Sequence, residues 1–179
     1  MPYPIDQKLV IAVASSALFD LKESDSVFRG QGEKAYRRYQ EANLDKPLGK
    51  GVAFPFVRRF LSINGKFPEK CPVEVVLLSR NSAITGKRVF HSIHHYGLDI
   101  SRAAFLEGKS PYAYIPAFNA SLFLSANETD VLQAIDYGHP AGTVLPSHVV
   151  DDQDDAELRI AFDFDGVLAD DESERVFKA

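Results

Sequence analysis

The chain has 179 residues, of which 45% are hydrophobic and 25% charged, and its formal net charge is -5. This composition indicates a soluble globular protein of one domain, or of one domain with part of another, and the negative balance excludes a broad basic surface for nucleic acid. The single cysteine, Cys71, excludes an internal disulfide and fits a reducing, cytosolic setting. The apolar run near the N-terminus is too short to span a bilayer, so no membrane partner is expected.

Strand patterns and helix patterns alternate along residues 1–150. The first strand, LVIAVA over residues 9–14, is a continuous apolar run, which is typical of a strand buried on both faces of a parallel sheet. Further strands are predicted over residues 73–78, 103–106, 121–124 and 143–145, and helices over 32–45, 85–96, 111–118 and 128–137. In the last helix, Val131, Leu132 and Ile135 are predicted to face inward. Gly49, Gly51 and Pro55 predict a loop.

This alternation predicts an α/β fold, a doubly wound parallel sheet covered by helices on both faces.

The acidic run DDQDDAE at residues 151–157 predicts a solvated linker. Arg58 and Arg59 are predicted to be surface charges. After the linker, residues 158–162 have the pattern of another buried strand. The predicted organisation is therefore one α/β domain over residues 1–150, followed over residues 151–179 by the linker and the first strand, turn and helix of a second unit.

An internal repeat connects these two units. The segment LVIAVASSALFDLKESDSVFR, from Leu9, aligns without a gap with LRIAFDFDGVLADDESERVFK, from Leu158. The shared tail, E-S-x-x-V-F followed by a basic residue, favours duplication over chance similarity. Asp163 and Asp165 of the second copy stand where the first copy has Ala14 and Ser16. If these acids perform chemistry, the first copy has lost it.

The motif Asp-Phe-Asp-Gly over residues 163–166 fits phosphoryl transfer. At the carboxyl end of a buried parallel strand, Asp163 can attack phosphorus as a nucleophile, while Asp165 can act as general acid and base. Both carboxylates can bind Mg²⁺, and Gly166 allows a sharp turn that turns backbone N–H groups toward a phosphate. The alternatives are a simple acidic turn or a Ca²⁺-binding loop, although the buried run before the motif argues against the helix–loop–helix arrangement of an EF-hand.

The longest segment that carries a family resemblance is VVLLSRNSAITGKRVFHSIHHYGLDISRAAFLEGKSPYAYIPAFNASLFLSANETDV. Together with LVIAVASSALFDL, AGTVLPS and the repeat from Leu158, it makes nearly the whole chain resemble the cytosolic 5′-nucleotidase I family of the haloacid-dehalogenase (HAD) superfamily. The resemblance implies a Rossmann-like three-layer sandwich of the HAD type and Mg²⁺-dependent hydrolysis of nucleoside 5′-monophosphates in the cytosol. Asp163 and Asp165 take the catalytic and metal-binding positions. The sequence leaves a homo-oligomer open.

In the HAD pattern, a strand-ending Ser or Thr, a lysine and further metal-binding acids follow the first motif, and none of these follows Asp165 here. Either the chain is an N-terminal fragment, or its first half supplies them. Ser79 and Lys109 are the candidates for phosphate binding there. Ser79 can equally be a strand end before a helix cap, and Lys109 a solvated loop lysine. The further metal-binding acids would be expected in the turn that begins at Ser125. In this turn only Glu128 is acidic.

Two other functions remain as alternatives. One is a non-catalytic nucleotide-binding or regulatory fragment, which the missing lysine and acids favour. The other is a HAD phosphatase that acts on another small phosphate ester.

Overall fold

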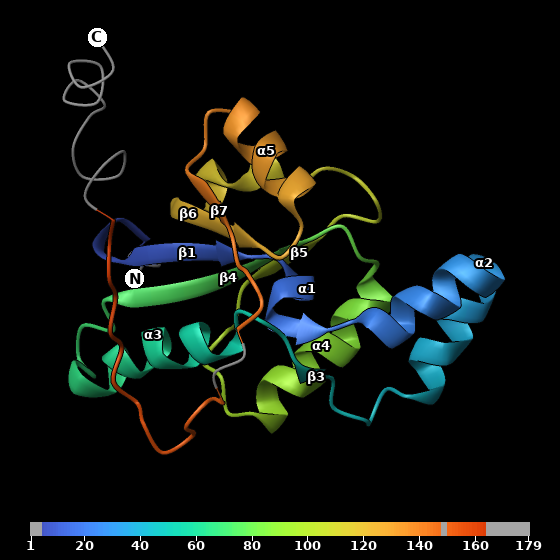
Figure 1. Ribbon diagram of the computed structural model, residues 1–179, viewed down its shortest axis with the longest axis horizontal. Helices are drawn as coiled ribbons and strands as arrows, with labels where there is room; N and C mark the ends of the chain where they lie inside the picture. Colours follow the sequence, from blue (N-terminus) through green and yellow to red (C-terminus); the bar gives the residue numbers. More distant parts are fainter. Residues whose placement is uncertain (1–4, 148–149, 164–179) are drawn as a thin grey trace, which may run out of the picture.

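A parallel five-stranded sheet forms the centre of the computed structural model, which describes residues 5–147 and 150–163 (Figure 1). The strand order is β5-β4-β1-β6-β7, and every neighbouring pair is parallel. The strands are β1 (Leu9–Val13), β4 (Val73–Ser79), β5 (Ala103–Phe105), β6 (Ala120–Ser125) and β7 (Ala141–Thr143). The chain moves outward from β1 through β4 to β5 and then crosses to β6 and β7. The predicted doubly wound α/β fold is therefore confirmed.

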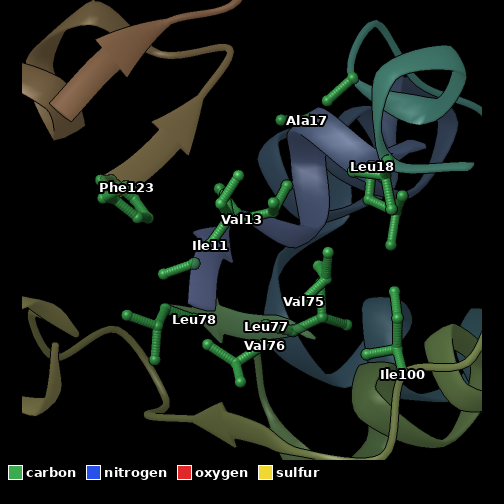
Figure 2. Close-up of a cluster of buried hydrophobic side chains, with 14 of the residues drawn as sticks. Ile11, Val13, Ala17, Leu18, Val75, Val76, Leu77, Leu78, Ile100 and Phe123 are labelled. Atoms are coloured by element: carbon green, nitrogen blue, oxygen red, sulfur yellow. The ribbon is translucent and has the colours of Figure 1, made fainter. Parts of the chain in front are cut away.

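The middle strand, β1, is surrounded by other elements. Ile11 pairs with Val75 of β4 on one side and with Leu122 of β6 on the other. Val10 and Val13 are fully buried, and Figure 2 shows the side chains of β1 among apolar residues of β4 and β6. A strand with sheet neighbours on both edges and helices on both faces has no solvated side, which explains its apolar, β-branched sequence.

Helices cover the two faces of the sheet. Figure 1 shows α3 (Phe54–Lys66) and α4 (Ala83–His95) on one side and α5 (Glu128–Asp136) on the other. The predicted helix over residues 111–118 is two short 3₁₀ turns, η2 (Tyr112–Tyr114) and η3 (Pro116–Phe118), and a further 3₁₀ turn, η1 (Ile5–Gln7), precedes β1. Among the described residues, no helix is long and apolar enough to cross a membrane.

The prediction for the inward face of α5 is partly wrong. Val131 is buried as predicted, but Leu132 is 54% exposed and Ile135 is 49% exposed. The second buried residue of the helix is Ala134. Because α5 covers β6 and the edge strand β7, only a narrow stripe of the helix meets the sheet.

A helical insertion separates the two strands of a small hairpin. After β1 comes a single helical turn, α1 (Ser15–Leu18), and then β2 (Phe19–Asp20), which pairs antiparallel with β3 (Gly49–Lys50). Between β2 and β3 lies α2 (Lys22–Ala42), which is broken into two limbs at Gly32, where φ is 78°. The predicted helix over residues 32–45 corresponds to the second limb.

The loop predicted from Gly49, Gly51 and Pro55 is wrong at both ends, because Gly49 lies in β3 and Pro55 lies in α3. Pro55 lies in the first turn of α3, where a helix needs no N–H donor from it. Gly51 is required for a different reason: a Cβ atom at this position would lie 2.4 Å from the carbonyl oxygen of Ala17. This close approach holds the hairpin against α1.

The buried strand predicted over residues 158–162 is also wrong for the described chain. This segment has no regular secondary structure, and Ile160 and Phe162 are 56% and 66% exposed. A parallel strand becomes buried only when neighbouring strands and helices cover it. Among the described residues, no strand pairs with this segment. The turn and helix predicted after it lie outside the described residues.

The acidic segment before it is attached to α3 rather than solvated along its whole length (Figure 1). The Asp151 carboxylate lies 2.7 Å from Nη1 of Arg59 and 3.3 Å from Nη2 of Arg58. Arg58 also donates to the carbonyl oxygens of Asp152 and Asp155, at 2.8 and 2.9 Å. The hydroxyl of Ser62 donates to the carbonyl oxygen of residue 156 at 2.8 Å. We call these contacts the linker clasp.

The linker clasp predicts a specific effect of Arg58→Ala. Removing the guanidinium leaves the carbonyl oxygens of Gln153 and Asp155 without their donor and leaves Asp151 with Arg59 alone, so the segment should detach from α3 more often. We expect cleavage after Glu157 by a glutamate-specific protease to become about tenfold faster. The control is Arg37→Ala, which removes an exposed pair with Glu33 at 2.7 Å and should leave cleavage unchanged. Equal cleavage of wild type and Arg58→Ala would show that the clasp does not hold the segment.

Candidate functional site

A cavity of about 710 Å³ opens at the carboxyl ends of β1, β4 and β6. Doubly wound sheets bind ligands at this edge, next to the point where the strand order reverses, and the volume suits a small molecule. We call this space the strand-end cavity. The strand ends and the start of α5 contribute Ser15, Ser79, Arg80, Asn81, Asn127 and Asp130 to its lining, and the hairpin and α2 contribute Asp20, Lys22, Asp25, Arg29, Tyr36 and Lys50.

The first polar network of the cavity joins the ends of β1 and β4. The hydroxyl oxygens of Ser15 and Ser79 lie 2.8 Å apart, and both residues are almost fully buried. The side-chain amide of Asn81 donates to Ser15 Oγ at 3.1 Å, and its backbone N–H donates to Ser79 Oγ at the same distance. A serine hydroxyl has one donor and two acceptor positions, so this serine network can also hydrogen-bond a ligand oxygen.

The second polar network lies at the end of β6. The Arg80 guanidinium lies 3.0 Å from the Asp130 carboxylate and donates to the Tyr112 hydroxyl at 2.9 Å. Tyr112 in turn donates to Asp130 at 2.9 Å. Tyr112 is fully buried, and burial, followed by its hydrogen bond to Asp130, raises its pKa to about 12. The phenol is therefore a neutral donor that orients Asp130 toward Arg80.

The end of β1 carries no carboxylate. Ala14, Ser15 and Ser16 follow the strand directly, where the second copy of the repeat has its acidic motif. Within residues 5–147 and 150–163, no group of three or more His, Cys, Asp or Glu side chains could hold a metal ion. The strand-end cavity therefore offers hydroxyls, amides, cations and the carboxylates of Asp20, Asp25 and Asp130 to a ligand, but no carboxylate at the end of β1 and, among the described residues, no metal-binding cluster.

The predicted site residues lie in different places. Ser79 lines the strand-end cavity. Lys109 is exposed in the loop after β5 and does not line it. Asp163 is exposed at the end of the described segment, and Asp165 and Gly166 lie outside the described residues. The structure thus places Ser79 in the lining of the cavity, whereas Lys109 lies outside that lining.

Other cavity residues were not predicted as site residues. Ser15 comes directly after a predicted buried strand, and that position alone is a usable signal. Asp130 lies two residues beyond Glu128, the acid that the sequence singled out, and it is Asp130 that reaches the cavity. Tyr112 does not line the cavity, but its hydroxyl group contacts Arg80 and Asp130, which do; sequence spacing does not reveal these contacts.

The chain is similar to known proteins over its whole length. A family model described as 5′-nucleotidase matches residues 1–179. Cytosolic 5′-nucleotidase 1B of Homo sapiens is 34% identical over 184 aligned residues, which cover 99% of this chain and 30% of that protein. The chain therefore spans less than a third of the length of that relative.

A solved structure also aligns with the chain. It is the HAD domain of the effector protein Lem4 from Legionella pneumophila, with a TM-score of 0.42 and 12% identity. The alignment covers 79% of this chain and 88% of that one. The fold described above follows from the strand order of the chain itself.

The raised pKa of Tyr112 predicts a pH dependence of stability. The folded state holds the phenolic proton more tightly than the unfolded chain, in which tyrosine titrates near pH 10. The stabilisation is therefore fully present below about pH 10 and is lost as the pH rises toward 12. Between about pH 9 and pH 11.5, the free energy of unfolding should fall by about 2 kcal/mol more in wild type than in Tyr112→Phe.

Urea unfolding followed by circular dichroism at several pH values measures this difference. Tyr114→Phe, at a half-exposed tyrosine, is the control and should follow wild type. Parallel pH profiles for wild type and Tyr112→Phe would contradict the role of the buried phenol.

Proposed function

Because the chain belongs to the 5′-nucleotidase family, we propose that the protein encoded by its complete gene hydrolyses nucleoside 5′-monophosphates to nucleoside and phosphate in the cytosol. The family match over residues 1–179, which includes the motif from Asp163 to Gly166, carries this proposal. The absence of acids at the end of β1 supports assigning the chemistry to the second copy of the repeat rather than to the first.

The proposed reaction has two steps. In the first, an Asp163 carboxylate oxygen attacks phosphorus, the bond from phosphorus to the nucleoside O5′ breaks, and Asp165 gives its proton to O5′. In the second, Asp165 takes a proton from water, whose oxygen attacks the aspartyl-phosphate. The bond from phosphorus to Asp163 breaks, which releases phosphate and restores the carboxylate. The backbone N–H groups at Gly166 would bind the phosphate oxygens.

We propose Mg²⁺ as the cofactor of this site. The carboxylates of Asp163 and Asp165 are the hard oxygen ligands that Mg²⁺ prefers, and the ion would offset their repulsion of the phosphate. The end of β1 does not fit the ion, because the described residues hold no cluster of metal-binding side chains. Ser79 and Lys109 would serve Asp163 only if another sheet or another chain brought them to it.

The strand-end cavity favours a second function for the described domain itself, namely ligand binding without hydrolysis. The hydroxyls and cations of the cavity can bind an anion, and the residues at the end of β1 cannot form an aspartyl-phosphate. This candidate is compatible with the first, because each belongs to a different copy of the repeat.

The test of the proposed hydrolysis is phosphate release from AMP with Mg²⁺. The 179-residue chain alone should show little or no turnover, because preorganised charge neutralisation is usually the largest catalytic contribution and the described residues provide none for Asp163. The protein from the complete gene should be active, and Asp163→Asn should lower its kcat by roughly 10⁴-fold or more.

A panel of sugar phosphates tests the substrate class. Equal or faster turnover of sugar phosphates, or full activity in excess chelator, would contradict the proposal. Robust turnover by the 179-residue chain that Asp163→Asn abolishes would show that Ser79 and Lys109 complete the site.

A further inference from the structure

The strand-end cavity continues into a second cavity along α2. The second cavity has a volume of about 440 Å³. Both cavities share four lining residues: Asp25, Tyr36, Arg80 and Asn81. They therefore form one groove that extends from the carboxyl ends of the strands to the helical insertion, and the two ends of the groove differ in chemistry.

The end at the strands suits an anion. Its floor is the serine network of Ser15, Ser79 and Asn81, and four cationic side chains against three carboxylates line the strand-end cavity. Lys50, at the end of β3, is one of these cations and is exposed. Hydroxyl and amide donors with a small excess of positive charge can bind phosphate oxygens.

The end at α2 is an aromatic wall. The rings of Phe28 and Tyr36 come from the two limbs of α2 and meet edge to face, with centroids 5.5 Å apart. The left-handed backbone of Gly32 turns the chain between the limbs. The Tyr36 hydroxyl lies 2.6 Å from Oγ1 of Thr85, which fixes the ring to α4. Phe28 lines the second cavity and is 48% exposed, so part of its ring is open to a ligand.

We propose that this groove binds a nucleoside phosphate and does not hydrolyse it. The phosphate binds at the serine network, and the base packs against Phe28 beside Tyr36. The ligand stays intact because Ser15 Oγ is paired with Ser79 and Asn81, neither of which can take its proton, and Ala14 and Ser16 have no carboxylate. The cavity carboxylate of Asp130 is held by Arg80 and Tyr112. Binding here does not depend on hydrolysis at Asp163, and it gives the first copy of the repeat a function of its own.

The test is isothermal titration calorimetry of the 179-residue chain with AMP, adenosine and inorganic phosphate, in excess chelator. AMP should bind more tightly than either part, because it uses both ends of the groove. Binding should persist in chelator, since the described residues form no metal cluster, and it should persist in Asp163→Asn. The AMP recovered after titration should be intact.

Variants with matched controls test the contributions of the aromatic end and the anion-binding end of the groove separately. Phe28→Ala should weaken AMP binding about tenfold and leave phosphate binding unchanged. The control is Phe67→Ala, because Phe67 is 53% exposed at the end of α3, outside both cavities. Ser79→Ala should weaken AMP and phosphate alike. If that variant unfolds, Lys50→Gln tests the same end of the groove, with Lys66→Gln as its control.

Several results would overturn the proposal: no heat of binding at millimolar AMP, equal losses in Phe28→Ala and Phe67→Ala, or binding that requires Mg²⁺ and disappears in Asp163→Asn. The last result would place the ligand at the acidic motif instead. Failure of the proposed hydrolysis would leave these binding measurements unaffected, because they are made without metal and without turnover.

Discussion

The burial of β1 between β4 and β6 determines where the polar groups at the strand ends of the candidate site lie. The backbone N–H of Ala14 donates to the carbonyl oxygen of Leu124 at 2.8 Å, so the chain stays in the sheet up to the residue before Ser15. Ser15 then turns into α1, beside the ends of both neighbouring strands. A shift of β1 along its neighbours would move Ser15 away from Ser79 and open the floor of the cavity. The apolar pairing of the strands thus fixes the position of the polar site.

Once this position is fixed, the residue types that occupy it decide the chemistry. Two carboxylates at the end of β1 would need a cation to offset their repulsion. Ala14 and Ser16 remove that need, and the buried hydroxyls of Ser15 and Ser79 form a hydrogen bond with each other. The first copy of the repeat can therefore keep its cavity without a metal ion. We propose that the two copies of the sequence repeat have separate tasks: the copy with Asp163 and Asp165 performs the proposed hydrolysis, and the described domain binds a ligand.

The sequence was sufficient to predict the sheet, because a strand buried on all sides needs an apolar run such as residues 9–14 or 75–78. The sequence was insufficient where one residue type is favoured in two different kinds of secondary structure. Pro55 suggested a loop, although proline is also favoured in the first turn of a helix. Residues 158–162 have the same apolar pattern as β1, but a pattern does not supply neighbouring strands. Contacts such as Arg80 with Asp130 join residues far apart in the chain and depend on strand order, so only the structure could reveal them.

The most direct test of this division is to locate the covalent intermediate. The protein from the complete gene is mixed with AMP and Mg²⁺, the aspartyl-phosphate is reduced with borohydride, and mass spectrometry then locates the aspartate that has become homoserine. The account predicts homoserine at Asp163 and unchanged aspartates throughout residues 5–147. Homoserine at Asp20, Asp25 or Asp130, which line the strand-end cavity, would place the chemistry in the first copy and contradict the account.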